Sequence, residues 1–126
     1  MNSKVFMILR ILLGLFVLFF GLNKLIPGGL IEMPPLEGDA LAYFTGLIKS
    51  KTLTLVAIVE VVAGVALIFN KYGALLAIVL MSVSVNALLF HAVLDPGGIF
   101  GAIVLIILNI VVLYGYKNKY KDLLNL

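Results

Sequence analysis

Four long apolar segments constrain this chain more than any other feature of its sequence. They cover Val5–Ile26, Thr52–Phe69, Gly73–Leu94 and Ile99–Tyr116, and each holds about 18–22 residues. At about 1.5 Å per residue, a helix of this length crosses the hydrocarbon core of a bilayer, which is about 30 Å thick. The apolar residues run continuously instead of alternating with polar ones, which favours helices over the strands of a barrel. The sequence therefore predicts an all-α polytopic membrane protein with four transmembrane helices.

The composition agrees with this class. Of the 126 residues, 63% are hydrophobic and 12% are charged, whereas soluble domains are about 45–50% apolar and about 25% charged. The four segments take up most of the chain, so we expect one domain over residues 1–126. The net charge of +3 comes from basic residues that mostly flank the apolar segments, which indicates contact with lipid headgroups and no nucleic acid partner. The chain has no cysteine, which excludes thiol nucleophiles, disulfide exchange and thiolate metal sites.

Short connections predict how the helices are arranged. Asn70–Tyr72 joins the second and third segments, and Asp95–Gly98 joins the third and fourth. Helices joined by so few residues are antiparallel neighbours, so we expect an antiparallel four-helix bundle. The first segment has the positive start of a signal peptide, but no small-residue cleavage site follows it, and we interpret it as a retained helix.

The connection Pro27–Lys51 is longer and has two interpretations. Asp39 can cap a short helix, one face of which would carry Ala40, Phe44, Leu47 and Ile48. Such an amphipathic helix would lie on the membrane surface. The alternative is a plain loop packed over the mouth of the bundle.

The distribution of basic residues predicts the orientation in the membrane. One side would hold both termini together with Lys4, Lys71, Lys117, Lys119 and Lys121. The other side would hold three lysines and four acidic residues, namely Lys24, Lys49, Lys51, Glu32, Glu37, Asp39 and Asp95. Because an excess of lysine and arginine marks the cytoplasmic side, we predict that both termini are cytoplasmic. The expected location is the bacterial cytoplasmic (inner) membrane, which the protein crosses several times.

Each apolar segment carries a polar residue at membrane depth, in chain order Arg10, Glu60, Asn86 and Asn109. A charge near the centre of a bilayer costs roughly 2.5–3.5 kcal/mol on insertion scales, so it normally has a partner or a task. The long side chain of Arg10 can reach toward the centre, and we expect it to form an ion pair with Glu60. With the two amides, this pair would form a buried polar cluster that either binds a ligand or holds the helices together.

Helical spacing supports this convergence. The polar residues share faces with small or apolar ones in four sets: Arg10, Gly14, Val17, Gly21 and Lys24; Ala57, Glu60, Gly64, Leu67 and Lys71; Val79, Ser82, Asn86 and Leu89; Ala102, Ile106, Asn109 and Leu113. Small residues beside a polar one are typical of a membrane helix interface. We therefore expect all four faces to point into the bundle.

His91 is the only histidine and lies near the predicted level of Asn23 and Lys24. It is five residues from Asn86, about 140° around a helix, so these two side chains do not share a face. We assign His91, Asn23 and Lys24 to a separate outer group of candidate ligand-binding residues. A single histidine with no soft ligand nearby predicts no metal site and argues against a haem.

Three stretches resemble the DoxX/DoxD-like family of small four-helix membrane proteins. They are Arg10–Lys24 (RILLGLFVLFFGLNK), Glu60–Phe69 (EVVAGVALIF) and Asn86–His91. The similarity extends over essentially the whole chain and is strongest in the first two apolar segments. It implies the four-helix fold. Some members are described as subunits linked to quinone, thiosulfate or thiol-related oxidoreductases, and a divergent animal branch resembles receptor-assembly chaperones.

Three functions are compatible with these features. The first is an accessory subunit without catalytic residues, whose cluster binds a quinone or a similar lipid-soluble molecule through Arg10, Asn86 or Asn109. The second is a structural or chaperone-like protein that meets a partner through Pro27–Lys51. The third is a small proton-coupled transporter, although such transporters carry their glutamate in the first helix. No catalytic constellation is present in the sequence, so we do not expect an isolated enzyme.

A homodimer is a further expectation. Membrane helices approach closely through small residues, and two such faces are available, Gly14/Gly21 and Ala63/Gly64. The same small residues are equally suited to contacts inside one bundle.

Overall fold

The computed structural model describes residues 1–125, and this part of the chain is helical throughout apart from its connections. Four helical stretches are long and apolar enough to cross a membrane: α1 (Ser3–Leu25), α3 (Thr52–Phe69), α4 (Gly73–Val93) and α5 (Ile99–Gly115), the last together with the turn Pro96–Gly98 before it. The remaining elements are α2 (Gly38–Lys49) and three short turns, η1 (Pro96–Gly98), η2 (Lys117–Tyr120) and α6 (Lys121–Leu124). The four long helices confirm the predicted fold and identify a small multi-pass membrane protein.

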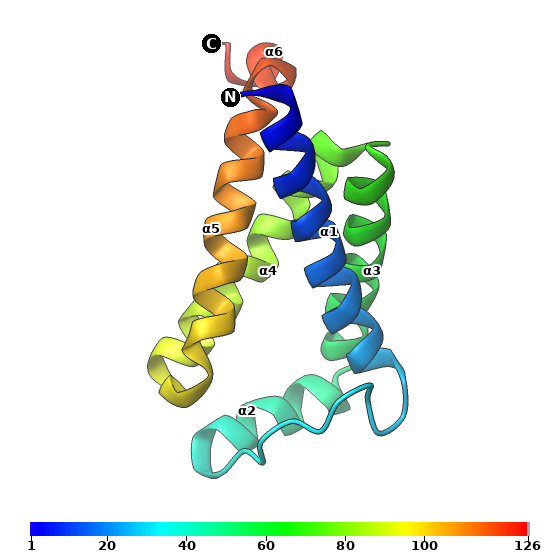
Figure 1. Cartoon of the computed structure of the whole chain (residues 1–126). Coiled ribbons are helices and arrows are strands. Elements are labelled where there is room, and N and C mark those ends of the chain that lie inside the picture. Colours follow the sequence, from blue (N-terminus) through cyan, green and yellow to red (C-terminus); the bar gives the residue numbers. More distant parts are fainter. Residues whose placement is uncertain (126) are drawn as a thin grey trace.

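The bundle has two distinct ends (Figure 1). The N-terminus, η2 and α6 lie at one end, which we call the terminal end. α2 crosses the opposite end, which we call the α2 end. Among the long helices, α1 packs mainly on α3 and α4 mainly on α5, while α3 also contacts α4 and α1 also contacts α5. α1 and α5 lie close together near the terminal end and diverge toward α2 (Figure 1).

Local chemistry explains where the helices begin and turn. The Asn2 side chain accepts hydrogen bonds from the backbone N–H groups of Lys4 and Val5, at 2.8 and 3.4 Å, which caps α1. Asn70 and Tyr72 adopt left-handed φ angles of 54° and 59°. Asparagine tolerates this conformation, and the two residues together reverse the chain between α3 and α4.

Glycine lets α1 and α3 approach each other closely. A Cβ atom added to Gly14 would lie 2.9 Å from the carbonyl oxygen of Gly64, and one added to Gly64 would lie 2.8 Å from the carbonyl oxygen of Gly14. Both distances are too short for a Cβ atom. The two helix backbones can therefore be in direct contact only because glycine occupies both positions. The interior around this contact is apolar, with Leu13, Val17 and Leu67 fully buried.

Tyrosines close the terminal end. The Tyr116 hydroxyl donates to Asn70 Oδ1 at 2.5 Å, and the Tyr120 hydroxyl donates to the Ala74 carbonyl at 2.7 Å. The ring of Phe6 meets Tyr116 edge to face at 4.9 Å between ring centres. Burial and the neighbouring Tyr116 raise the pKa of Tyr120 to about 12, so the phenol keeps its proton and its hydrogen bond. These contacts tie the start of α1 and the end of α5 to the α3–α4 turn.

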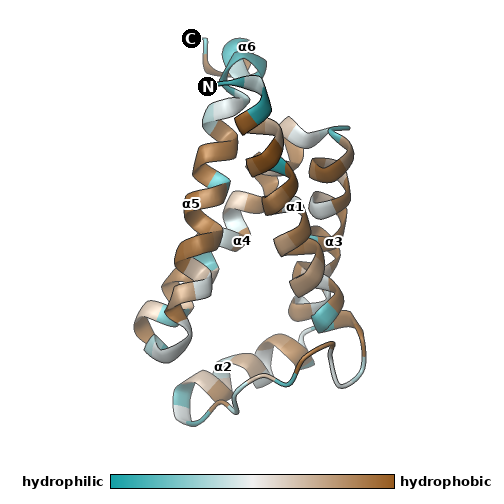
Figure 2. Cartoon of the chain, in the orientation of Figure 1, coloured by the Kyte–Doolittle hydropathy of each residue, from teal (hydrophilic) through white to brown (hydrophobic). Residues whose placement is uncertain are grey.

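Hydrophobic residues make up most of the four spans (Figure 2). Large apolar side chains of these spans are well exposed, among them Leu55, Leu75, Phe100 and Ile107. So much exposed apolar surface would be unusual on a soluble monomer, whereas in a bilayer it contacts lipid.

The connection Pro27–Lys51 contains the predicted helix, α2, while its position on the membrane surface stays a prediction. On α2, Ala40 is buried and Phe44 is half-buried, but Ile48 is 57% exposed and does not belong to the packed face. The rings of Tyr43 and Phe44 lie 5.3 and 5.1 Å from the ring of Phe90 in α4.

The predicted cap of this helix is wrong. Glu37 occupies the N-cap position and makes no side-chain cap, while Asp39 lies in the first turn. There the negative charge of Asp39 is favourable beside the positive end of the helix dipole.

Candidate functional site

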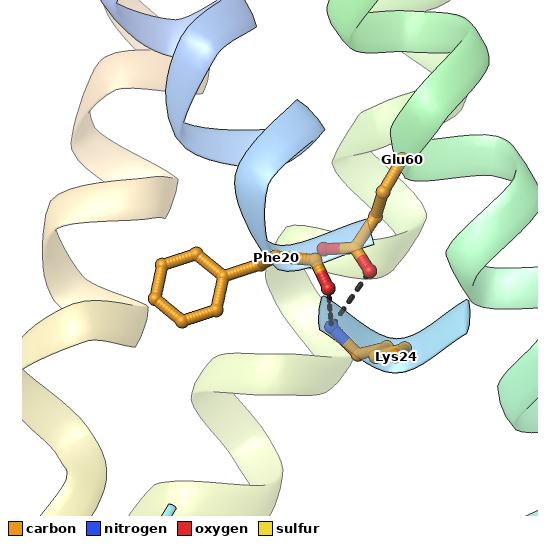
Figure 3. A network of polar contacts seen from close by, with 3 residues as sticks. All are labelled: Phe20, Lys24 and Glu60. Carbon is orange, nitrogen blue, oxygen red and sulfur yellow. Dashed lines mark hydrogen bonds and ion pairs between the residues drawn. The ribbon is translucent and has the colours of Figure 1, made fainter. Parts of the chain in front are cut away.

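The polar centre of the bundle is an ion pair between α1 and α3. Lys24 Nζ lies 2.7 Å from Glu60 Oε1 and also donates to the carbonyl oxygen of Phe20 at 3.5 Å. Figure 3 shows the two side chains meeting between the helices. Glu60 is 3% exposed, whereas the Lys24 side chain is 24% exposed. A carboxylate in the apolar interior is therefore held by a cation that keeps partial access to its surroundings.

The predicted ion pair between Arg10 and Glu60 is wrong. Helical side chains lean toward the N-terminus of their own helix. α1 and α3 are antiparallel, so Glu60 leans toward the α2 end while Arg10 leans toward the terminal end, away from it. Lys24, one turn beyond Phe20 near the end of α1, leans back into the bundle and meets Glu60.

Arg10 instead binds the end of α3. Its Nη1 donates to the carbonyl oxygens of Leu67 and Ile68, the second bond at 3.1 Å. These carbonyls belong to the last turn of α3, which has no basic residue of its own. A cation at a helix C-terminus satisfies free carbonyls and stabilises the negative end of the helix dipole. Arg10 is 8% exposed, and its role is to cap a neighbouring helix.

Asn109 lies at the interface of α4 and α5 and is fully buried. Its Nδ2 donates to the Ala77 carbonyl at 3.0 Å, and its Oδ1 accepts from Ser84 Oγ at 2.7 Å. Both ends of the carboxamide are thus used between two helices, which is the structural role of an amide in a membrane interface. The prediction that Asn109 faces inward is confirmed, but its partner Ser84 was missed. The signal for Ser84 is its spacing, because it continues the small-residue positions Gly73 and Ala77 along one helical face.

Asn86 does not join this network, and the predicted inward face of the third segment is wrong. Asn86 is exposed on α4, and its Nδ2 donates to the carbonyl oxygen of Ser82 one turn earlier. The buried positions of α4 include Ala77, Leu80 and Ser84, so the small residues and not the amide mark the face that packs against the bundle.

The three predicted outer residues do not form one cluster. Lys24 pairs with Glu60, as described. Asn23 Oδ1 accepts from the N–H groups of Leu30 and Ile31 at 2.6 and 3.1 Å, which stabilises the turn that follows α1. His91 Nδ1 lies 3.1 Å from Asp95 Oδ2 at the end of α4. Asn23 and His91 therefore have local partners that fix chain turns.

The Lys24–Glu60 pair keeps unused hydrogen-bonding capacity. Within residues 1–125, no fully buried side-chain oxygen or nitrogen lacks a partner. Glu60 Oε2 makes no hydrogen bond there, so it must reach accessible space, and Lys24 Nζ uses only two of its three donors. The Phe20 ring lies beside the pair, 6.0 Å from Lys24 Nζ, and contacts the rings of Phe16 and Phe19. One donor and one acceptor are thus available beside an aromatic surface at membrane depth.

No metal centre is apparent in the described part of the chain, where no three His, Asp or Glu side chains gather. Comparison of the chain with models of protein families, with curated proteins and with solved structures gave no match. What the site can bind is therefore inferred from its geometry alone.

Proposed function

We propose that this protein is a DoxX-like accessory membrane subunit that binds a quinone or a similar lipid-soluble carbonyl compound at the Lys24–Glu60 pair. The observation that carries the proposal is an ion pair at membrane depth with an unused donor and an unused acceptor. We place the terminal end, which carries five lysines, on the cytoplasmic side of a bacterial inner membrane.

The chemistry of a quinone fits this pair. A quinone carbonyl oxygen accepts hydrogen bonds, and Lys24 Nζ has a donor to offer. The hydroxyl of the reduced form donates, and Glu60 Oε2 can accept. The flat ring of such a molecule packs well against aromatic side chains, which Phe20 and its neighbours supply. The role that we propose for these residues is binding, without a chemical step on the protein.

The structure changes which residues would bind the ligand. Arg10 donates to α3 carbonyls, and Asn109 uses both ends of its carboxamide within the bundle. Asn109 cannot bind a quinone without giving up these bonds, and Arg10 already serves as the cap of α3. The proposed binding role therefore passes to Lys24, with Glu60 holding it in place.

A double variant separates binding from stability. Removing Lys24 alone leaves a buried carboxylate without its partner, which destabilises by about 3–5 kcal/mol and would obscure any effect on binding. Lys24→Met combined with Glu60→Leu replaces both charges by apolar groups of similar size, so we expect the fold to be retained. Lys49→Met, at an exposed lysine of α2, is the matched control.

The measurement is calorimetric titration of the purified protein in lipid nanodiscs with a short-chain ubiquinone. We expect saturable binding for wild type and for the Lys49→Met control, and at least tenfold weaker binding for the double variant at unchanged thermal stability. Equal binding by the double variant would refute the site, and no binding by wild type would refute the function.

A second function is favoured by a different observation. The connection before α2 and the outer face of α2 expose apolar side chains at the α2 end: Leu30, Ile31, Met33, Leu41 and Ile48. A partner protein in the membrane surface could cover them, as a structural or chaperone-like role requires. Retention of a stoichiometric partner during purification, lost in Leu41→Glu, would favour this function over the quinone site.

A further inference from the structure

One face of α4 is exposed along most of its length. Val79, Ser82, Asn86, Leu89 and Val93 follow each other at steps of three and four residues, and all five are exposed. We call these five residues the α4 seam. Steps of three and four are the a/d spacing with which helices pack in left-handed coiled coils and in most membrane bundles.

Two polar residues distinguish this face from the other exposed faces. Away from the ends of the four spans, Ser82 and Asn86 are the only exposed polar side chains in the part of the chain that the structure describes. Ser82 Oγ donates to its own helix, at the Val79 carbonyl, and Asn86 Nδ2 donates to the Ser82 carbonyl, both at 2.8 Å. The second Nδ2 proton and the Oδ1 of Asn86 have no partner within residues 1–125. In hydrocarbon, such groups are costly unless another molecule satisfies them.

We propose that the α4 seam is a dimer interface, occupied by the same seam of a second copy of this chain. The seam has no charged residue, so two copies can approach without repulsion. An unpaired carboxamide offers one donor and one acceptor, and it is therefore complementary to another carboxamide. A two-fold axis along the membrane normal places the same residue of each copy face to face.

The membrane favours this arrangement over other contacts between copies. Two copies inserted in the same orientation have parallel α4 helices, and parallel helices with a/d spacing bring equivalent residues together at the axis. A single polar residue in such a seam fixes the register, because any shift leaves the amides unpaired. Asn86, in the middle of the seam, is placed to do this.

A surface hollow gives the facing helix room. It has a volume of about 260 Å³ and is lined by three seam residues, Asn86, Leu89 and Val93, with Tyr43, Phe90 and Leu94 around them. Side chains of the second copy can enter it as knobs enter holes. The interface is separate from the Lys24–Glu60 pair, which lies between α1 and α3, so the dimer does not depend on the proposed quinone site.

The absence of cysteine in the chain permits a direct test. Single substitutions Ser82→Cys, Asn86→Cys and Leu89→Cys place a thiol along the seam. Val62→Cys in α3 and Ile107→Cys in α5 place one on exposed faces of other helices. Membranes containing each variant are treated with copper phenanthroline to oxidise the thiols, and the masses of the products are measured by mass spectrometry. We expect a covalent homodimer at the seam positions, at least fivefold more abundant than at the two control positions.

A second substitution tests the amide. In the Leu89→Cys background, Asn86→Leu should lower the dimer yield by about 3- to 30-fold at matched protein-to-lipid ratios, the range expected for interhelical polar contacts, and Asn86→Gln should retain most of it. Equal cross-linking at Val62 or Ile107 would overturn the proposal, and so would an unchanged yield in Asn86→Leu or an adduct whose mass is not twice that of the chain. The last result would assign the seam to a different protein.

Discussion

Arg10 and Lys24 lie on the same face of α1, but they serve different groups because both side chains lean toward the N-terminus of the helix. That direction takes Arg10 to the end of α3 and takes Lys24 back to Glu60. Sequence spacing placed both cations and the carboxylate on packed faces. Spacing could not predict which of the two cations pairs with Glu60, because that depends on the axial register between α1 and α3. The contact between Gly14 and Gly64 sets that register.

The role of Arg10 as a cap for α3 can be tested by mutation. Arg10→Met removes two donors from carbonyls in the last turn of α3, so we expect the free energy of unfolding to fall by about 1–3 kcal/mol. Lys71→Met, at an exposed lysine of the same end of the bundle, should change it by less than about 0.5 kcal/mol. Reversible unfolding in mixed detergent micelles measures both. Equal losses in the two variants would show that Arg10 acts only through general charge.

The helices themselves follow from apolar length and turn residues, and every predicted boundary lies within about two residues of the observed one. The face of α4 that packs into the bundle could not be predicted in the same way. Its amide suggested an inward face, because polar groups normally avoid lipid, yet Ala77 and Ser84 pack inward and Asn86 faces out. The small residues were the stronger signal, because Ala77 and Ser84 both meet Asn109 of α5. A polar group can face outward where another chain covers it, which is the situation that we propose for the α4 seam.

The close packing of α1 on α3 can also be tested by mutation. Gly14→Ala places a methyl group 2.9 Å from the Gly64 carbonyl, so the helices must move apart, and we expect a loss of about 1–3 kcal/mol in unfolding free energy. Gly46→Ala is the matched control within a helix, because a Cβ there meets nothing within 4 Å. It should be neutral or stabilise α2 by up to about 1 kcal/mol. A Gly14→Ala protein as stable as wild type would mean that α1 and α3 are not in backbone contact.

At the scale of the whole molecule, the polar groups divide between two helix pairs. α1 and α3 carry the Lys24–Glu60 pair, while α4 and α5 carry the saturated Asn109–Ser84 network. Tyrosines hold the pairs together at the terminal end, and α2 packs against α3 and Phe90 at the other end. The sequence predicted a single four-residue cluster at the centre. The fold instead uses three of the predicted polar residues for capping, helix contacts and an outer face, and leaves one ion pair with capacity for a ligand.

The most direct test of that account observes the ammonium group of Lys24. Protein labelled with ¹⁵N at lysine Nζ is placed in lipid bilayers, and solid-state NMR spectra are recorded with and without a short-chain ubiquinone. The double variant Lys24→Met/Glu60→Leu, which leaves no unpaired buried charge, identifies the Lys24 resonance among those of the other lysines. We predict that the quinone shifts the Lys24 signal and leaves the exposed lysines unchanged. An unmoved Lys24 signal at a quinone concentration that saturates binding would contradict the central claim that this ion pair holds the ligand.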